Sequence, residues 1–232
     1  MQRPSQNFKF AVIGLDHRHI YEMTGRLLEH GCECIGYWTD GEPQPLAGFV
    51  KRFPHIQRVG DKRRLLEDRT VKLILTAAIN CDRAPIAIEA MRHGKDVMSD
   101  KPGCTTAEQL ADLRGVVAQT GRIWSVNYSE RFEVPAVTCA IELVNAGAIG
   151  RVVQTVGLGP HRLNRNLRPA WFFQRDKYGG VLCDVASHQI EQFLTFTGST
   201  DATIVTSSVG NFANPSDQIG RASCRERVCL YV

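Results

Sequence analysis

The sequence lacks several features that mark whole classes of protein. No apolar run approaches the roughly 18 residues that a membrane-spanning helix needs, so a transmembrane protein is not expected. The first seven residues are polar and lead directly into an apolar stretch, so no secretory signal is predicted. There is no internal repeat and no low-complexity segment. With 43% hydrophobic and 22% charged residues, the composition is that of an ordinary globular protein.

The cysteines and the charge exclude further classes. The eight cysteines form no disulfide framework, and no pair has the spacing of zinc ligands, so we expect reduced thiols in a cytoplasmic protein and no metal site. The net charge of +4 is mild. The basic residues are scattered rather than gathered in a stripe, so neither nucleic acid nor a membrane is an expected partner.

The last residues do not match the rest of the chain. From Ile219 to Val232 the sequence shows no clear helix or strand period. When the run from Ile219 to Val228 is translated back into DNA, it resembles a common short-read sequencing adapter. We therefore predict a non-native tail over 219–232; the alternative is a genuine basic tail. The tail supplies +2 of the net charge, from three arginines and one glutamate, so no partner is inferred from it.

Strands and helices alternate over the first 130 residues. Phe8–Gly14, Cys32–Thr39, Val71–Ala78, Asp96–Ser99 and Ile123–Tyr128 have strand character. The intervening helices are expected over Ile20–His30, Leu46–Phe53, Ala84–His93 and Thr105–Thr120, with Thr105 or Thr106 as a cap. This alternation is typical of βαβ units, so the fold class is α/β with a Rossmann-type parallel sheet over 1–130.

A second domain is predicted over 131–218. Pro135–Ala146 and Asp184–Thr197 have helical spacing, and 150–159 and 202–210 alternate like strands. The segment from His161 to Lys177 is a basic and aromatic loop. We therefore expect the beginning of an α+β domain with a boundary near 128–134.

The turn after the first strand is the candidate cofactor site. A strand that ends in glycine before a helix directs backbone N–H groups toward an anion such as a pyrophosphate. The usual G-x-G-x-x-G fingerprint is incomplete here, because Asp16 and His19 replace the second and third glycines of Gly14-Leu15-Asp16-His17-Arg18-His19. Asp16 would repel a pyrophosphate unless it points away or pairs with Arg18 or a histidine. His17 and His19 are expected to hydrogen-bond to a cofactor phosphate or to Asp16; a metal pair is the weaker alternative.

Asp40 supports this interpretation. It follows Gly14 by 26 residues and ends the second strand, where a carboxylate can accept both ribose hydroxyls of NAD and would repel a 2′-phosphate. The alternative is a solvated turn aspartate. Because Arg18 could bind a phosphate, NADP also stays open.

Three motifs resemble one family. Ser99-Asp100-Lys101-Pro102 resembles the Glu-Lys-Pro motif of the Gfo/Idh/MocA oxidoreductases, with aspartate in place of glutamate. The stretch Val126–Phe132 resembles the family segment that follows the sixth strand of the dinucleotide domain. The run Gly179–His188 resembles the family's glycine pair followed by Asp184 and His188, four residues apart. The order and spacing of these motifs fit over essentially all of 8–210.

The resemblance implies a function and its residues. It implies an NAD(P)-dependent dehydrogenase or reductase of a sugar, polyol or related hydroxy compound, with Lys101, Asp184 and His188 as the catalytic group. A neutral histidine can take the alcohol proton near neutral pH, and a carboxylate at i and i+4 lies on the same helix face. Lys101 could polarise the substrate oxygen or position the nicotinamide. Ala77, Asp100, Lys101 and Pro102 complete the expected cofactor contacts.

Substrate contacts are expected from Asn127, Tyr128 and the basic loop. In the loop, His161, Arg165 and Arg168 could hold carboxylates, phosphates or sugar hydroxyls, and Trp171 offers an apolar platform. A solvated loop with Trp171 packed inside the protein is the alternative. Two other functions stay open, namely a redox-assisted lyase or hydrolase with retained NAD and a non-catalytic dinucleotide- or sugar-binding regulator.

The resemblance also implies a truncated protein. The family's second domain closes with an open, mostly antiparallel sheet that serves as an oligomer interface. Most of that sheet is expected to lie beyond residue 218, so the full-length protein is expected to be a homo-oligomer and this chain to be poorly soluble.

Overall fold

The computed structural model describes residues 8–158, 163–208 and 227–231. The chain divides into two compact units, residues 1–127 and 128–232. Among the described helices, none combines the length and the apolar composition that crossing a bilayer requires.

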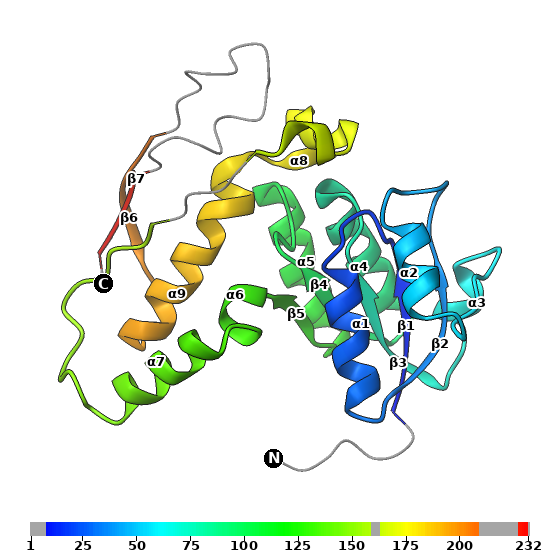
Figure 1. Ribbon diagram of the computed structural model, residues 1–232, viewed down its shortest axis with the longest axis horizontal. Coiled ribbons are helices and arrows are strands. Elements are labelled where there is room, and N and C mark those ends of the chain that lie inside the picture. The colour runs from blue at the N-terminus through cyan, green and yellow to red at the C-terminus, as the bar shows by residue number, and fades with distance from the viewer. Residues whose placement is uncertain (1–7, 159–162, 209–226, 232) are drawn as a thin grey trace. The chain divides into compact units, whose positions relative to one another are not determined.

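The first unit is built on a parallel sheet of five strands (Figure 1). The strands are β1 (Lys9–Ile13), β2 (Glu33–Trp38), β3 (Val71–Thr76), β4 (Asp96–Asp100) and β5 (Trp124–Asn127). Their spatial order is β2-β1-β3-β4-β5, and every neighbouring pair is parallel. From β1 the chain adds β2 on one side of the sheet and then β3, β4 and β5 on the other side. The boundary between β1 and β3 is therefore the topological switch point, where open α/β sheets bind ligands. The predicted Rossmann-type fold is confirmed.

Helices cover both faces of this sheet. They are α1 (Ile20–Glu29), α2 (Leu46–Arg52), α3 (Arg63–Leu66), α4 (Arg83–Arg92) and α5 (Ala107–Thr120), with a 3-10 turn at Asn80–Asp82. As predicted, α5 is capped by Thr106, whose hydroxyl accepts a hydrogen bond from the Gln109 N–H.

Alternation along the strands builds one core on each face. On β1, Phe10 and Val12 pack in the core beneath α1 and α2, whereas Ala11 and Ile13 pack in the core beneath α3, α4 and α5. Such two-sided burial is why these strands read as continuous apolar runs in the sequence. It also fixes the carboxyl ends of the strands along one edge, from which the site residues project.

The second unit contains mainly helices. These are α6 (Ser129–Phe132), α7 (Pro135–Asn145), α8 (Arg175–Tyr178) and α9 (Ser187–Thr197), with 3-10 turns at Arg165–Leu167 and Ala170–Phe173. The stretch Leu182–Ala186 before α9 is a π-helix. Strand β6 (Thr203–Ser208) pairs antiparallel with β7 (Arg227–Tyr231). The expected tail therefore contains a strand where the sequence showed no strand period.

The prediction of a strand over 150–159 is wrong for residues 150–158, which the structure describes. Residues 150–158 form neither a strand nor a helix. Val153, Val156 and Leu158 are strongly exposed, so the apolar side chains of this segment have no surface to pack against. Alternation predicts a half-buried pleated strand, but a strand also needs a partner with which its backbone can pair.

Candidate functional site

The two loops at the switch point are held together by backbone hydrogen bonds. The loop after β1 starts at Gly14, whose N–H donates to Trp38 O at 2.9 Å. The His17 N–H donates to Ala77 O at 2.8 Å, and the Ala77 N–H donates to Gly14 O at 3.1 Å. Ala77, a predicted cofactor contact, therefore lies directly beside the glycine turn at the carboxyl edge of the sheet.

Gly14 is required by this close approach. Its φ is +85°, and a Cβ placed on it would lie 2.5 Å from the Cβ of Ala78. The backbone N–H groups of Leu15, Arg18 and His19 have no acceptor among the described residues, and α1 begins at Ile20. Free N–H groups in front of a helix N-terminus suit a phosphate, so this cradle fits the pyrophosphate of a dinucleotide.

Asp16 is turned toward the loop after β3. Its carboxylate accepts a hydrogen bond from the Ile79 N–H. Burial, with a smaller contribution from Asp82, raises the pKa of Asp16 to about 6. This partner lies on the neighbouring loop and is neither Arg18 nor a histidine, which were the two partners considered from the sequence.

Asp40 lies beyond the carboxyl end of β2. It is exposed and comes two residues after β2 ends at Trp38, at the same edge of the sheet as Gly14. An exposed carboxylate next to the switch point fits the 2′- and 3′-hydroxyls of NAD better than a 2′-phosphate.

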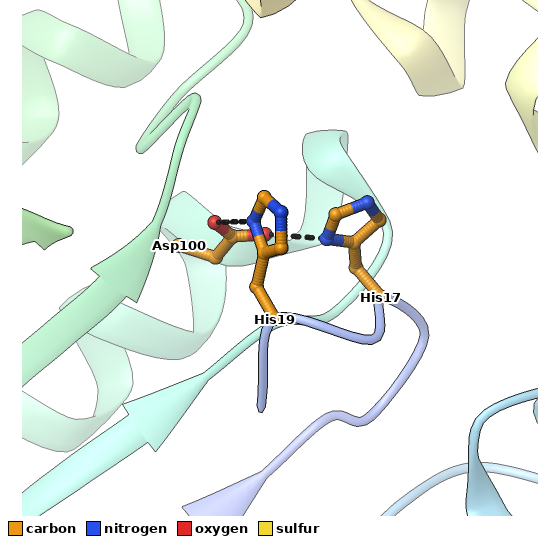
Figure 2. A group of neighbouring side chains, drawn as sticks. All are labelled: His17, His19 and Asp100. Carbon is orange, nitrogen blue, oxygen red and sulfur yellow. Dashed lines mark hydrogen bonds and ion pairs between the residues drawn. The ribbon is translucent and has the colours of Figure 1, made fainter. Parts of the chain in front are cut away.

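A buried carboxylate organises the loop histidines (Figure 2). Asp100, at the end of β4, is completely buried. Its Oδ1 lies 2.9 Å from His19 Nδ1, and its Oδ2 lies 2.9 Å from His17 Nδ1. The two imidazole rings lie edge to face with their centroids 4.2 Å apart. The prediction that the histidines hydrogen-bond to Asp16 is therefore wrong, because Asp100 is the carboxylate that they share.

Arg83 largely determines the charge state of the cluster formed by His17, His19 and Asp100. Burial alone would raise the pKa of Asp100, but the Arg83 guanidinium and the two histidines outweigh it and hold the pKa well below its usual value. Burial lowers the pKa of His17 to about 4 against the opposing effect of Asp100. Asp100 is thus ionised and His17 is neutral at neutral pH.

Arg83 was missed by the sequence analysis. It is buried at the start of α4 and lies 3.1 Å from Asp100 through Nη2. Its other nitrogens donate to the carbonyls of Ala78, Lys101 and Pro102. The sequence offered one signal for it, namely an arginine in the first turn of a helix. The helix dipole disfavours a cation there, so such an arginine needs a specific partner. Through these bonds Arg83 fixes the Asp100-Lys101-Pro102 motif, whose Lys101–Pro102 peptide is cis.

The proposed catalytic residues belong to both units. Lys101 is buried in the first unit, directly after Asp100, and its N–H donates to Asp100 Oδ1 at 2.8 Å. Asp184 and His188 are buried in the second unit, in the continuous helical stretch formed by the π-helix and α9.

Two further residues surround Asp184 and His188. The Tyr178 hydroxyl donates to Asp184 Oδ2 at 2.8 Å. His188 Nδ1 lies 3.7 Å from Glu130 Oε2, and its ring meets the Tyr128 ring edge to face at 5.8 Å between centroids. Tyr178 and Glu130 were not predicted as site residues, although Glu130 lies inside one of the quoted motifs. A buried histidine with one nitrogen facing a carboxylate is suited to proton transfer.

The predicted substrate residues have different environments. Arg165 is exposed and lies over the Phe173 ring, 4.7 Å from its centroid, whereas Arg168 is half-buried and lies over the Phe172 ring at 4.5 Å. Trp171 is buried and packs against Phe172, as in the alternative interpretation of the loop. Asn127 ends β5 and pairs in register with Asp100. His161 lies outside the described residues.

Comparison with known proteins agrees with this organisation. Residues 8–128 match the oxidoreductase family with an NAD-binding Rossmann fold, and residues 137–224 match the Gfo/Idh/MocA C-terminal domain. Levoglucosan dehydrogenase of Pseudarthrobacter phenanthrenivorans is 28% identical over 167 residues, which cover 71% of this chain and 43% of that enzyme. This chain thus spans less than half the length of that relative.

Solved structures show the same fold. The crystal structure of a candidate oxidoreductase from Erwinia carotovora atroseptica SCRI1043 is 44% identical with a TM-score of 0.87, covering 90% of this chain and 62% of that chain. A levoglucosan dehydrogenase in complex with NADH has a TM-score of 0.69 at 22% identity, covering 89% of this chain and 57% of that chain, which shows the fold alone. Because the Rossmann-domain match alone covers more than half of the chain, the protein belongs to the Gfo/Idh/MocA oxidoreductase family.

Proposed function

We propose that the full-length protein is an NAD(P)-dependent dehydrogenase or reductase acting on a carbinol carbon of a sugar, polyol or related hydroxy compound. The proposal is supported by an NAD-type cradle at the switch point of the first unit and by a buried Asp184 and His188 on one helical stretch of the second unit. The names of relatives, among them levoglucosan dehydrogenase and two scyllo-inositol 2-dehydrogenases of Bacillus subtilis, support this substrate class.

The chain's own residues divide the work of binding. The N–H groups of the Gly14–His19 loop hold the pyrophosphate of the dinucleotide, and Asp40 holds its adenosine ribose in the NAD form. When bound, the nicotinamide accepts the hydride that leaves the carbinol carbon. Lys101 positions the nicotinamide or the substrate oxygen, because a cation stabilises negative charge that develops on that oxygen.

His188 handles the proton. In the direction of alcohol oxidation, the carbinol C–H bond supplies the hydride and the O–H bond supplies a proton, and His188 takes the proton as the carbonyl forms. Asp184 and Glu130 stabilise the resulting imidazolium, and Tyr178 keeps the Asp184 carboxylate oriented through its hydrogen bond. In the direction of reduction, the same histidine returns the proton.

The test is a paired measurement of binding and turnover. NADH and NADPH are titrated by fluorescence, and NADH formation is followed with NAD and a panel of levoglucosan, D-xylose and scyllo-inositol. Replacing His188 with Gln is expected to lower turnover about 10²- to 10⁴-fold with little change in NADH affinity. The same replacement at His93, which is exposed at the end of α4, is the matched control. Unchanged turnover in the His188 variant would remove the acid–base assignment.

Two outcomes would favour the alternatives. Tightly held cofactor with no net turnover of external NAD would point to a redox-assisted lyase or hydrolase. Dinucleotide binding with no reaction on any substrate would point to a regulator of the same fold. A preference for NADH that disappears in Asp40→Ala would establish the role of Asp40.

We also propose that the full-length protein is a homo-oligomer. Support comes from the strongly exposed Val153, Val156, Leu158, Ile204 and Val205 on the second unit. Apolar surface of this kind commonly marks an interface. Light scattering of the full-length protein would test it, and a monomer at micromolar concentration would contradict it.

A further inference from the structure

The Asp100 carboxylate is surrounded by nitrogen atoms on all sides. Oδ1 lies 2.9 Å from His19 Nδ1 and 2.8 Å from the Lys101 backbone nitrogen, and Oδ2 lies 2.9 Å from His17 Nδ1 and 3.1 Å from Arg83 Nη2. An ionised carboxylate only accepts hydrogen bonds and has about four positions at which to do so. Four nitrogens thus lie within 3.1 Å of the carboxylate oxygens, two of them hydrogen-bonded to Oδ1 and two in close contact with Oδ2.

This arrangement determines the tautomer of each histidine: His19 Nδ1 is hydrogen-bonded to Asp100 Oδ1, and His17 Nδ1 is in contact with Asp100 Oδ2 at 2.9 Å. A ring nitrogen that faces a buried carboxylate at 2.9 Å must carry a proton, because two lone pairs at that distance would repel each other. In the neutral form of each ring the proton is then on Nδ1, so Nε2 keeps its lone pair. His17 is neutral at neutral pH, since its pKa is lowered to about 4 by burial. Its Nε2 therefore accepts a hydrogen bond and does not donate one.

The Nε2 atoms of both rings face away from the carboxylate. Asp100 is completely buried, whereas 19% of the His17 side chain and 26% of the His19 side chain are exposed. Figure 2 shows the second nitrogen of each ring on the side remote from Asp100. Both histidines stand on the loop between β1 and α1, beside the N–H groups of Leu15, Arg18 and His19 that suit a phosphate.

A metal ion fits this cluster less well than a hydrogen-bond donor does. Two histidines and one carboxylate, with ligand atoms within 4.8 Å of one another, have the composition of a transition-metal site. Arg83, however, already neutralises Asp100 at 3.1 Å, and a divalent ion on the same carboxylate would be repelled by the buried guanidinium. The protons on Nδ1 also occupy the lone pairs that a metal would need.

We propose that His17 and His19 form a hydroxyl-binding pair, whose Nε2 atoms accept hydrogen bonds from the hydroxyl groups of a bound ligand. The ligand is a polyhydroxy group with adjacent O–H donors, which comes either from a ribose of the dinucleotide or from the polyol substrate. The pyrophosphate of a dinucleotide carries no proton at neutral pH and is not the partner of these side chains. The backbone N–H groups of the same loop remain the phosphate donors.

The first test needs no ligand. Long-range ¹H–¹⁵N correlation spectra of the intact chain report which ring nitrogen of each histidine carries the proton. Resonances are assigned by their loss in His17→Phe and His19→Phe. We expect both residues to be in the form protonated on Nδ1 at neutral pH. The Nε2–H form at either position would overturn the proposal.

The second test identifies the source of the hydroxyls. His17→Phe and His19→Phe keep an aromatic ring but remove the acceptor, and His30→Phe, at the exposed end of α1, is the matched control. A loss of about 3- to 10-fold in NADH affinity, the effect of one hydrogen bond, would assign the ribose. Unchanged NADH affinity with a similar loss in affinity for scyllo-inositol or D-xylose, measured with NAD present, would assign the substrate. No change in either affinity would mean that the pair binds no hydroxyl, and the proposal would be wrong.

The polyol measurement rests on the proposed function, whereas the tautomer measurement does not. If no substrate is turned over but both histidines carry the proton on Nδ1, the proposed dehydrogenase activity is contradicted and the tautomer assignment is not. A titration with Co²⁺ completes the set. Visible absorption bands of protein-bound Co²⁺ that disappear in both histidine variants would replace the hydroxyl site with a metal site.

Discussion

Arg83 and Asp100 form an ion pair in which both side chains are fully buried and Nη2 lies 3.1 Å from Oδ2. The same guanidinium donates to the carbonyl of Ala78 after β3 and to the carbonyls of Lys101 and Pro102 after β4. One side chain thus connects the carboxyl ends of two neighbouring strands. A buried pair that is broken on one side leaves an unpaired charge in the interior, which is far more unfavourable than the pair itself.

Removing this guanidinium should therefore destabilise the first unit. We expect Arg83→Met to lower the free energy of unfolding by about 3–5 kcal/mol, because Asp100 loses its counter-ion. Arg83→Lys should recover only part of this loss, since an ammonium cannot reach acceptors in several fixed directions. The measurement is urea denaturation followed by circular dichroism. Arg92→Met, exposed on the same helix, is the control, and an equal effect at both positions would contradict the prediction.

A comparison of two glycines distinguishes the effect of backbone conformation on stability from the effect of close packing. Gly14 and Gly31 have φ values of +85° and +82°, but a Cβ on Gly14 would meet Ala78 at 2.5 Å, whereas nothing lies within 4 Å of a Cβ on Gly31. Alanine at Gly31 should lower the free energy of unfolding by about 1–2 kcal/mol, the effect of the left-handed conformation. Alanine at Gly14 should be clearly worse and should also weaken NADH binding. Equal stability losses with equal NADH affinities would show that the contact with Ala78 is unimportant.

Asp16 should make stability depend on pH. Its pKa in the folded protein is raised to about 6 by burial, above the value of 3.8 for an unperturbed aspartate, so the folded protein holds this proton more tightly than the unfolded chain. Stability from this group is therefore present at low pH and is lost as the pH rises through about 6.

Asp16→Asn removes the ionisation and keeps an acceptor for the Ile79 N–H. The variant should gain stability relative to the unmodified protein on going from about pH 5 to about pH 7.5. Urea denaturation at the two pH values gives the comparison. His17, whose pKa is lowered from 6.5 to about 4, contributes its own pH dependence, but it is present in both proteins and its contribution cancels in the comparison. A difference in stability between the two proteins that is independent of pH would rule out a raised pKa for Asp16.

The Tyr178 hydroxyl should affect both stability and acid–base behaviour. Tyr178→Phe removes the hydrogen bond to Asp184 and should lower the free energy of unfolding by about 1–2 kcal/mol. If Asp184 supports His188, the pH–rate profile should also shift. Tyr21→Phe is the matched control, because that hydroxyl donates to Pro45 O in the first unit and has no link to His188. An equal shift of the pH–rate profile in both variants would contradict a role of Tyr178 in the reaction.

The backbone of the first unit was largely predictable. Strands buried on both faces appear as apolar runs, and the glycine that ends β1 marks the turn. What could not be predicted is how side chains far apart in sequence meet. His17 and His19 pointed to Asp16 as the nearest carboxylate in the sequence, but Asp100, 81 residues away from His19, meets them at the carboxyl edge of the sheet, although β3 separates β1 from β4. Arg83 belongs to no recognisable motif, because its role depends on the loops after β3 and β4, which only the folded sheet brings together.

The second unit was less predictable for a different reason. The strand-like pattern over 150–158 predicts a strand that needs a partner strand. Sequence alone does not show whether that partner is present. The spacing of Asp184 and His188 indicated an α-helix, yet Leu182–Ala186 is a π-helix. A π-turn contains more residues per turn than an α-turn, so the angle between the two side chains about the helix axis differs from the α-helical expectation.

The aspartate at position 100 has an evolutionary consequence. The motif that this segment resembles has a glutamate there, whose carboxylate would extend one methylene further and into the space of the two imidazole rings. We therefore expect a change at position 17, 19, 83 or 100 to be tolerated only together with changes at the other three. In homologous chains these four positions should be gained or lost together, and a glutamate at position 100 should be accompanied by smaller residues in the first loop.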